Sequence, residues 1–125
     1  LTGSWAAAML ALGGFEEMKA QATPVPPGIR VGENDPDLVV RDVTYDGLGS
    51  ALFGHLAMPR RLAGQVPGVI VIHENRGLVE HIRDVTRRFA KAGYVALGVD
   101  LLSRQGGTAQ FTEPTQQTQA YGRTT

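Results

Sequence analysis

Apolar residues follow two different periods along the chain, and these periods predict where strands and helices form. Residues 38–45 and 51–58 are rich in β-branched and other apolar side chains. They flank the stretch D-G-L-G-S, in which Asp46 and Gly47 form a dipeptide that favours a tight turn. This pattern predicts an antiparallel hairpin at the edge of a sheet.

A strand and a helix are predicted after the hairpin. The run V-I-V-I at residues 69–72 lacks polar alternation, which is typical of a strand covered on both faces in a parallel sheet. Residues 78–93 then carry apolar side chains at helical spacing and end at Gly93, a residue type that commonly stops a helix. The apolar stripe consists of Leu78, Ile82, Val85 and Phe89. The charged residues expected on the solvated side are Glu80, Arg83, Asp84, Arg87, Arg88 and Lys91.

An apolar strand at residues 94–100 completes this unit, and residues 113–121 can form one short helix near the end of the chain. A strand, a helix and a second, parallel strand in succession are typical of the α/β class. The predicted fold is therefore α/β, with an antiparallel hairpin followed by a β-α-β unit of a parallel sheet.

The chain divides into three stretches of different composition. Residues 1–22 are largely apolar and end in A-Q-A, which resembles a signal cleavage site after Ala22 and would indicate export. Two glutamates and the lack of a basic stretch are unusual in a signal, and the alternative is an N-terminal helix that packs on the domain. The apolar run is too short for a membrane-spanning helix of about 20 residues. Residues 23–37, rich in proline and glycine, predict a linker, and residues 38–125 are expected to form the amino-terminal part of an incomplete domain.

Composition and charge exclude several classes of function. The 125 residues include 12 basic and 12 acidic ones, so the formal net charge is zero and gives no attraction to nucleic acid or an anionic membrane. The chain has no cysteine, which excludes disulfides and thiolate metal sites within these residues. No feature of the sequence indicates an oligomeric state.

The polar stretch H-E-N-R-G, from His73 to Gly77, stands directly between the predicted buried strand and the helix. In α/β sheets, ligands bind beyond the carboxyl ends of the strands. Backbone N–H groups at such a turn can bind a developing oxyanion, and each is worth roughly 3 kcal/mol in a transition state. These residues are therefore a candidate active-site loop. The alternative is a loop whose side chains only cap the helix and hydrogen-bond to one another.

Several motifs occur together between Gly68 and Thr108, namely H-E-N-R-G, I-R-D-V, A-G-Y-V-A and D-L-L-S. In this combination they resemble the amino-terminal part of the dienelactone hydrolase family, a branch of the α/β-hydrolase superfamily. The predicted hairpin is similar to the opening strands of that family. The resemblance implies a partial α/β-hydrolase fold and cleavage of a small-molecule ester or lactone through a cysteine acyl-enzyme. It implies no cofactor and no metal.

The resemblance also implies roles for two residues of the loop. In that family the glutamate of the H-E loop interacts with the nucleophilic cysteine, and the next backbone N–H contributes to the oxyanion hole. These positions are Glu74 and Asn75 in this chain. A carboxylate beside a thiol can accept its proton, so the chemistry agrees with the implied role of Glu74. The alternative for Glu74 is a structural ion pair with Arg76 or Arg83.

Other polar residues near the loop are expected to support it or to contribute weakly. We expect His73 and Arg76 to support the loop rather than to transfer protons. Arg104 follows the next strand, where its guanidinium could bind a carboxylate group of the substrate. The alternative, which is slightly favoured, is an arginine that faces solvent. Asp100, at the end of that strand, is expected to be structural, because in this superfamily the triad acid follows the nucleophile.

The triad that the resemblance implies is absent from these 125 residues. There is no G-x-C-x-G-G and no G-x-S-x-G, and none of His55, His73 and His81 lies late enough in the chain to be the triad histidine. We therefore expect an amino-terminal fragment that is inactive alone, with the Cys-His-Asp triad beyond Thr125. The alternative is a non-catalytic remnant of a truncated α/β-hydrolase gene.

The spacing of the loop disfavours two other uses. A zinc peptidase needs H-E-x-x-H, but the position four residues after His73 is Gly77. A dinucleotide-binding turn needs G-x-G-x-x-G, whereas H-E-N-R-G-L has a single glycine. The sequence therefore predicts neither a metal site nor a dinucleotide site.

Overall fold

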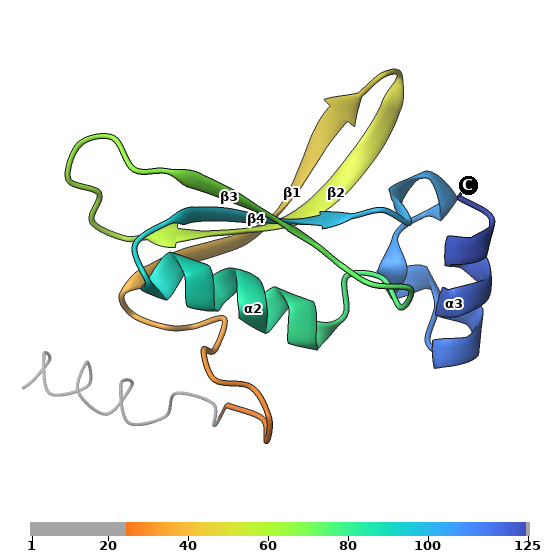
Figure 1. The fold of residues 1–125 in the computed structure, drawn as a ribbon, viewed down its shortest axis with the longest axis horizontal. Coiled ribbons are helices and arrows are strands. Elements are labelled where there is room, and N and C mark those ends of the chain that lie inside the picture. Colours follow the sequence, from red (N-terminus) through yellow and green to blue (C-terminus); the bar gives the residue numbers. More distant parts are fainter. Residues whose placement is uncertain (1–24, 125) are drawn as a thin grey trace, which may run out of the picture.

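The computed structural model describes residues 25–124, so the apolar segment at residues 1–22 lies outside the described residues. The strands form one sheet in the order β1-β2-β4-β3 (Figure 1). They are β1 (Leu38–Gly47), β2 (Ser50–Pro59), β3 (Gly68–Ile72) and β4 (Val95–Asp100). β2 is antiparallel to both β1 and β4, whereas β3 and β4 are parallel. The predicted hairpin is confirmed, with β1 at the edge of the sheet.

Helix α2 (Glu80–Lys91) joins β3 to β4 and lies along one face of the sheet (Figure 1). This arrangement confirms the predicted β-α-β unit. Two 3-10 turns, Ser103–Gln105 and Thr108–Gln110, follow β4 and lead to α3 (Pro114–Gly122), which confirms the predicted short helix. Within residues 25–124, no helix has the length and apolar character needed to cross a membrane.

Gly93 stops helix α2, as the sequence predicts, two residues after the last helical residue, Lys91. This glycine has a φ of +106°, and its N–H donates to the Ala90 carbonyl at 2.9 Å. The Tyr94 N–H donates to the Phe89 carbonyl at 3.2 Å. These two bonds form a Schellman motif, which satisfies carbonyl groups at the end of the helix and turns the chain into β4.

The turn of the hairpin lies two residues later than the sequence predicts. Gly47 pairs with Ser50, so the turn consists of Leu48 and Gly49, with φ values of +51° and +80°. Positive φ at both central residues is the type I′ pattern, whose twist matches that of the flanking strands. Asp46 therefore belongs to β1 rather than to the turn.

The buried face of α2 differs from the predicted one. The sequence pattern places Asp84 and Arg87 on the solvated side, yet they are 1% and 0% exposed. Phe89 of the predicted apolar stripe is 38% exposed instead. The physical reason is that Asp84 and Arg87 bind backbone groups of residues 30–31, so hydrogen bonds decide which face is buried.

Strand β3 is covered on one face only among the described residues. Val71 is buried, but Ile70 and Ile72 are 67% and 66% exposed. Successive side chains of a strand point to opposite faces, so these two isoleucines share the face opposite to Val71. The prediction that both faces of this strand are covered is therefore wrong for residues 25–124. Within that part of the chain, residues 25–124, β3 is also an edge strand and pairs only with β4.

The apolar core is small and includes a residue of the predicted linker. Leu38, Ala57 and Ala90 form its buried centre, and Val31 and Val40 pack against them. Residues 25–37, the described part of this stretch, contain no helix or strand, and Val31 packs against the core.

Candidate active site

The candidate loop leaves the carboxyl end of β3 and lies beside the segment that follows β4. His73 is 4% exposed, and its Nε2 accepts a hydrogen bond from the Leu101 N–H at 2.9 Å. Because Nε2 is an acceptor, the ring proton is on Nδ1, which donates to the Glu74 carbonyl. The Tyr121 ring of α3 packs edge-on against the imidazole, with centroids 6.1 Å apart. Both nitrogens of His73 are therefore engaged in holding the loop.

Asp100, the last residue of β4, organises the segment that follows it. The residue is 8% exposed, and its carboxylate accepts hydrogen bonds from the N–H groups of Leu102 at 3.0 Å and Thr108 at 2.7 Å. It also accepts one from the Thr108 hydroxyl at 2.8 Å. The Ser103 hydroxyl donates to the Asp100 carbonyl and accepts from the Phe53 N–H of β2. These bonds fold the segment back over the end of the sheet.

Thr108 joins this segment to the candidate loop. Its hydroxyl oxygen accepts the Leu78 N–H at 2.8 Å while donating to Asp100, so one side chain links the start of α2 to the end of β4. Gly77 makes this approach possible. It has a φ of +81°, and a Cβ atom there would lie 2.2 Å from the Thr108 Oγ1. No sequence motif indicated Thr108; only its position after Asp100 could have drawn attention to it.

The residues with implied catalytic roles are exposed on this fixed loop. Glu74, Asn75 and Arg76 are all solvent-exposed. Within residues 25–124, Glu74 forms no ion pair and the Asn75 N–H has no hydrogen-bond acceptor. The alternative pairing of Glu74 with Arg83 is not formed, because Arg83 binds Asp42 at 2.6 Å.

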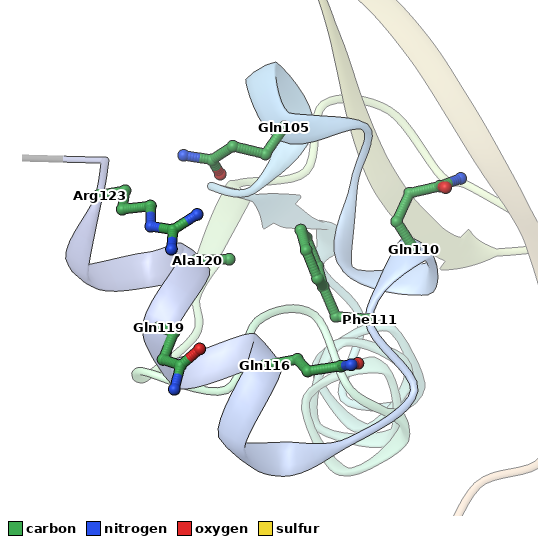
Figure 2. A pocket seen from close by; sticks show the side chains of 7 residues that line it. All are labelled: Gln105, Gln110, Phe111, Gln116, Gln119, Ala120 and Arg123. Atoms are coloured by element: carbon green, nitrogen blue, oxygen red, sulfur yellow. The ribbon is translucent and has the colours of Figure 1, made fainter.

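Arg104 lies in the first 3-10 turn after β4, and its side chain is exposed. A pocket of about 420 Å³ lies between the two 3-10 turns and α3. In Figure 2 the Phe111 ring stands between these elements. None of the predicted site residues lines this pocket. Its lining residues are Gln105, Gln110, Phe111, Gln116, Gln119, Ala120 and Arg123.

No group of three or more histidine, aspartate or glutamate side chains in the described part of the chain is arranged to hold a metal ion. The chemistry available at the loop is that of an exposed carboxylate and an unpaired backbone N–H, both held at the carboxyl end of a parallel strand.

The fold is shared with solved structures. One is titled "Crystal Structure of Putative Dienelactone Hydrolase from Klebsiella pneumoniae subsp. pneumoniae MGH 78578"; the TM-score is 0.56 at 34% identity, over 63% of this chain and 33% of that one. Another, titled "m3DLH", has a TM-score of 0.57 at 29% identity, over 70% of this chain and 35% of that one. The sheet order and the loop after β3 thus define part of an α/β-hydrolase fold, as predicted.

The family follows from the sequence match. Residues 52–125, more than half of the chain, match the model of the Dienelactone hydrolase family. The chain therefore belongs to the dienelactone hydrolase family, which confirms the resemblance found in its motifs.

Two relatives illustrate how far the similarity extends. A protein of Escherichia coli K12 named "Putative hydrolase fragment YghX" is 49% identical over 76 residues, which are 58% of this chain and 64% of that protein. A "Putative carboxymethylenebutenolidase" of Yersinia pestis is 38% identical over 71 residues, 57% of this chain. The chain spans only 27% of the Yersinia protein.

Proposed function

We propose that this chain supplies part of the active site of an ester or lactone hydrolase. The observation that carries the proposal is the loop after β3, which presents Glu74 and the Asn75 N–H while His73 and Leu78 are hydrogen-bonded to the segment after β4. An oxyanion donor is effective only when it is fixed before the reaction begins, and this loop is fixed at both ends.

The reaction proceeds through a cysteine acyl-enzyme. The thiolate, supplied from outside these 125 residues, attacks the carbonyl carbon, and the Asn75 N–H donates to the oxygen as it becomes negative. The ester C–O bond breaks, a histidine donates a proton to the leaving alkoxide, and a thioester remains. Water then hydrolyses the thioester with the same histidine as base. Glu74 contacts the thiol and sets the balance between thiol and thiolate.

A small lactone or ester is the proposed substrate. The name carboxymethylenebutenolidase, carried by the Yersinia pestis relative, refers to an unsaturated lactone with a carboxylate group. Arg104 lies beyond the end of β4 with its guanidinium exposed, and it is the proposed contact for such a carboxylate.

A second candidate function is a non-catalytic remnant of a hydrolase gene. One observation favours it: among residues 25–124, β3 exposes Ile70 and Ile72 beside an unpaired strand edge. An apolar face and an open edge together promote aggregation. This hypothesis predicts that the chain by itself is marginally stable and hydrolyses no ester.

The two functions are distinguished by the gene and its product. The open reading frame would be followed past the codon for Thr125, and the complete product would be purified and assayed with an aryl ester and a lactone. A frame that continues into G-x-C-x-G-G, with hydrolysis of either substrate, supports the hydrolase. A stop codon directly after Thr125, with no hydrolysis, supports the remnant.

A further inference from the structure

A polar network centred on the buried side chains of His55 and Arg87 lies between α2 and the hairpin. His55 of β2 is 1% exposed and contacts Asp42 of β1 through Nδ1 at 2.9 Å. On its other side, Nε2 lies 3.3 Å from an Nη atom of Arg87, which is itself fully buried. The buried imidazole therefore bridges the exposed Asp42 carboxylate and the buried Arg87 guanidinium.

The same guanidinium holds the irregular segment that precedes β1. The Nε of Arg87 donates to the Val31 carbonyl at 2.6 Å, and an Nη atom lies 3.6 Å from the Glu33 carboxylate. Asp84, one helical turn earlier, accepts the N–H groups of Arg30 at 3.0 Å and Val31 at 2.8 Å. Both backbone groups of Val31 are thus bound by side chains of α2. We refer to residues 30–33 as the latch segment.

The hydrogen bonds define the protonation state of His55. An arginine is always a donor, so Nε2 must accept from Arg87 and carries no proton. The proton is therefore on Nδ1, and it is donated to Asp42. A second proton, on Nε2, would point at the Arg87 guanidinium. Nε2 would then no longer accept the hydrogen bond from Arg87, and the positively charged imidazole would repel the guanidinium.

The charged groups around His55 act in opposite directions. Burial is the largest influence and lowers the pKa of His55 below its usual 6.5. The hydrogen bond to Asp42 raises this pKa, whereas the positive charges of Arg83 and Arg87 lower it. Glu33 of the latch segment and Glu80 of α2 both contact Arg87. The lowered pKa means that the unfolded or opened chain binds a proton more readily than the closed one.

We propose that His55 is a protonation switch that holds the latch segment against α2 while it is neutral and releases it when it becomes charged. Protonation displaces Arg87 from Nε2, and the Val31 carbonyl then loses its donor. Val31 also leaves the small apolar cluster that it covers. The stability of the latch is complete above about pH 6.5, the pKa of the open form, and falls as the pH decreases toward the lower pKa of the closed form.

The residues that follow the latch segment are held by a second set of ion pairs, which does not involve His55. Lys91 binds Asp35 at 2.9 Å and Asp37 at 2.7 Å. Burial would raise the pKa of Asp35, but the hydrogen bonds from Lys91 and from the Asp37 N–H outweigh it and hold this pKa below 3.8. Burial also acts to raise the pKa of Asp42, and bonds from Arg83 and His55 outweigh it in the same way. Both carboxylates therefore stay ionised at pH 5, and release is confined to the latch segment.

The test is amide hydrogen exchange of the purified 125-residue chain by NMR between about pH 7.5 and pH 5, corrected for intrinsic exchange rates. The Arg30 and Val31 amides report on the latch, and the Leu38 amide, bonded to the Asp35 carbonyl, reports on the second anchor. The protection factors of the Arg30 and Val31 amides against exchange are expected to fall by up to about tenfold per pH unit below pH 6.5, because His55 takes up one proton when the latch segment opens. Protection of Leu38 is expected to remain constant.

Two variants identify the responsible histidine. His55→Gln keeps an acceptor for Arg87 that cannot be protonated, so its Arg30 and Val31 protection is expected not to change with pH. His81→Gln, at an exposed position of α2, is the matched control and is expected to behave as the wild type does. Loss of protection in His55→Gln equal to that of the wild type would overturn the proposal.

If His55→Gln does not fold, the proposal is tested on the wild-type protein alone. The imidazole resonance of His55 is then followed in the same pH series. Titration of His55 in step with the loss of Arg30 and Val31 protection supports the switch. Titration of His55 without that loss, or constant protection over the whole range, overturns it.

Discussion

Gly77 occupies a position where both conformation and space require glycine. We predict that Gly77→Ala lowers the free energy of unfolding by roughly 2 to 4 kcal/mol, because it adds strain at positive φ and a clash with Thr108. Urea denaturation of the two proteins measures this. Gly64→Ala is the matched control, since Gly64 has a φ of +74° but open space around it. Equal losses in the two variants would show that the contact with Thr108 is unimportant.

Thr108 carries a second prediction at the scale of single residues. Thr108→Val keeps the shape of the side chain but leaves the buried Leu78 N–H without an acceptor and removes one donor from Asp100. We expect a loss of about 1–3 kcal/mol in the free energy of unfolding. Thr108→Ser retains the hydroxyl and should lose less than half as much. If both variants lose the same amount, the methyl group rather than the hydroxyl is responsible.

The sequence indicates some of the site residues and misses others for a physical reason. His73 and Glu74 could be noticed because polar residues directly after an apolar strand are unusual. Thr108 and Tyr121 could not, because their contacts with the loop join residues far apart in the chain. Local pattern describes what a residue is next to in sequence, whereas these contacts depend on how β4 and α3 return to the same edge of the sheet.

At the scale of elements, the hairpin turn contains an avoidable strain. Leu48 has a φ of +51° and is 97% exposed, so it bears the cost of a left-handed conformation without packing against anything. We predict that Leu48→Asn raises the free energy of unfolding by about 1 kcal/mol, because asparagine before glycine suits a type I′ turn. Thermal denaturation measures the change. Leu48→Ala, which keeps the strain, should give no comparable gain; an equal gain would refute the explanation.

The elements themselves were predictable, but the burial of their faces was only partly so. Strand and helix periods gave the correct order of elements, because these periods arise from local geometry. They gave the wrong buried face for α2, because Asp84 and Arg87 are buried by hydrogen bonds to residues 30–31. A charged side chain is buried when it is paired, and the pairing partner lies more than fifty residues away in sequence.

At the scale of the whole molecule, the described residues combine a well-fixed loop with an uncovered sheet face. The loop after β3 is held by His73, Leu78 and Thr108, whereas the face that carries Ile70 and Ile72 is exposed. The family relationship and the loop support a hydrolase, whereas the face of β3 that is uncovered within residues 25–124 is the observation in favour of the remnant. The hydrolase and the remnant hypotheses differ in the activity that they predict for the gene product, and not in the fold of residues 25–124.

The central claim, that Glu74 belongs to a hydrolase active site, is tested most directly by the kinetics of one variant. The complete gene product is assayed for hydrolysis of an aryl ester and a lactone as the wild type, as Glu74→Gln and as Asp46→Asn, an exposed carboxylate on the hairpin. We predict that Glu74→Gln lowers kcat/KM by roughly 100-fold or more with a changed pH profile, while Asp46→Asn has no effect. Wild-type activity in Glu74→Gln, or no hydrolysis by the wild type, would contradict the account.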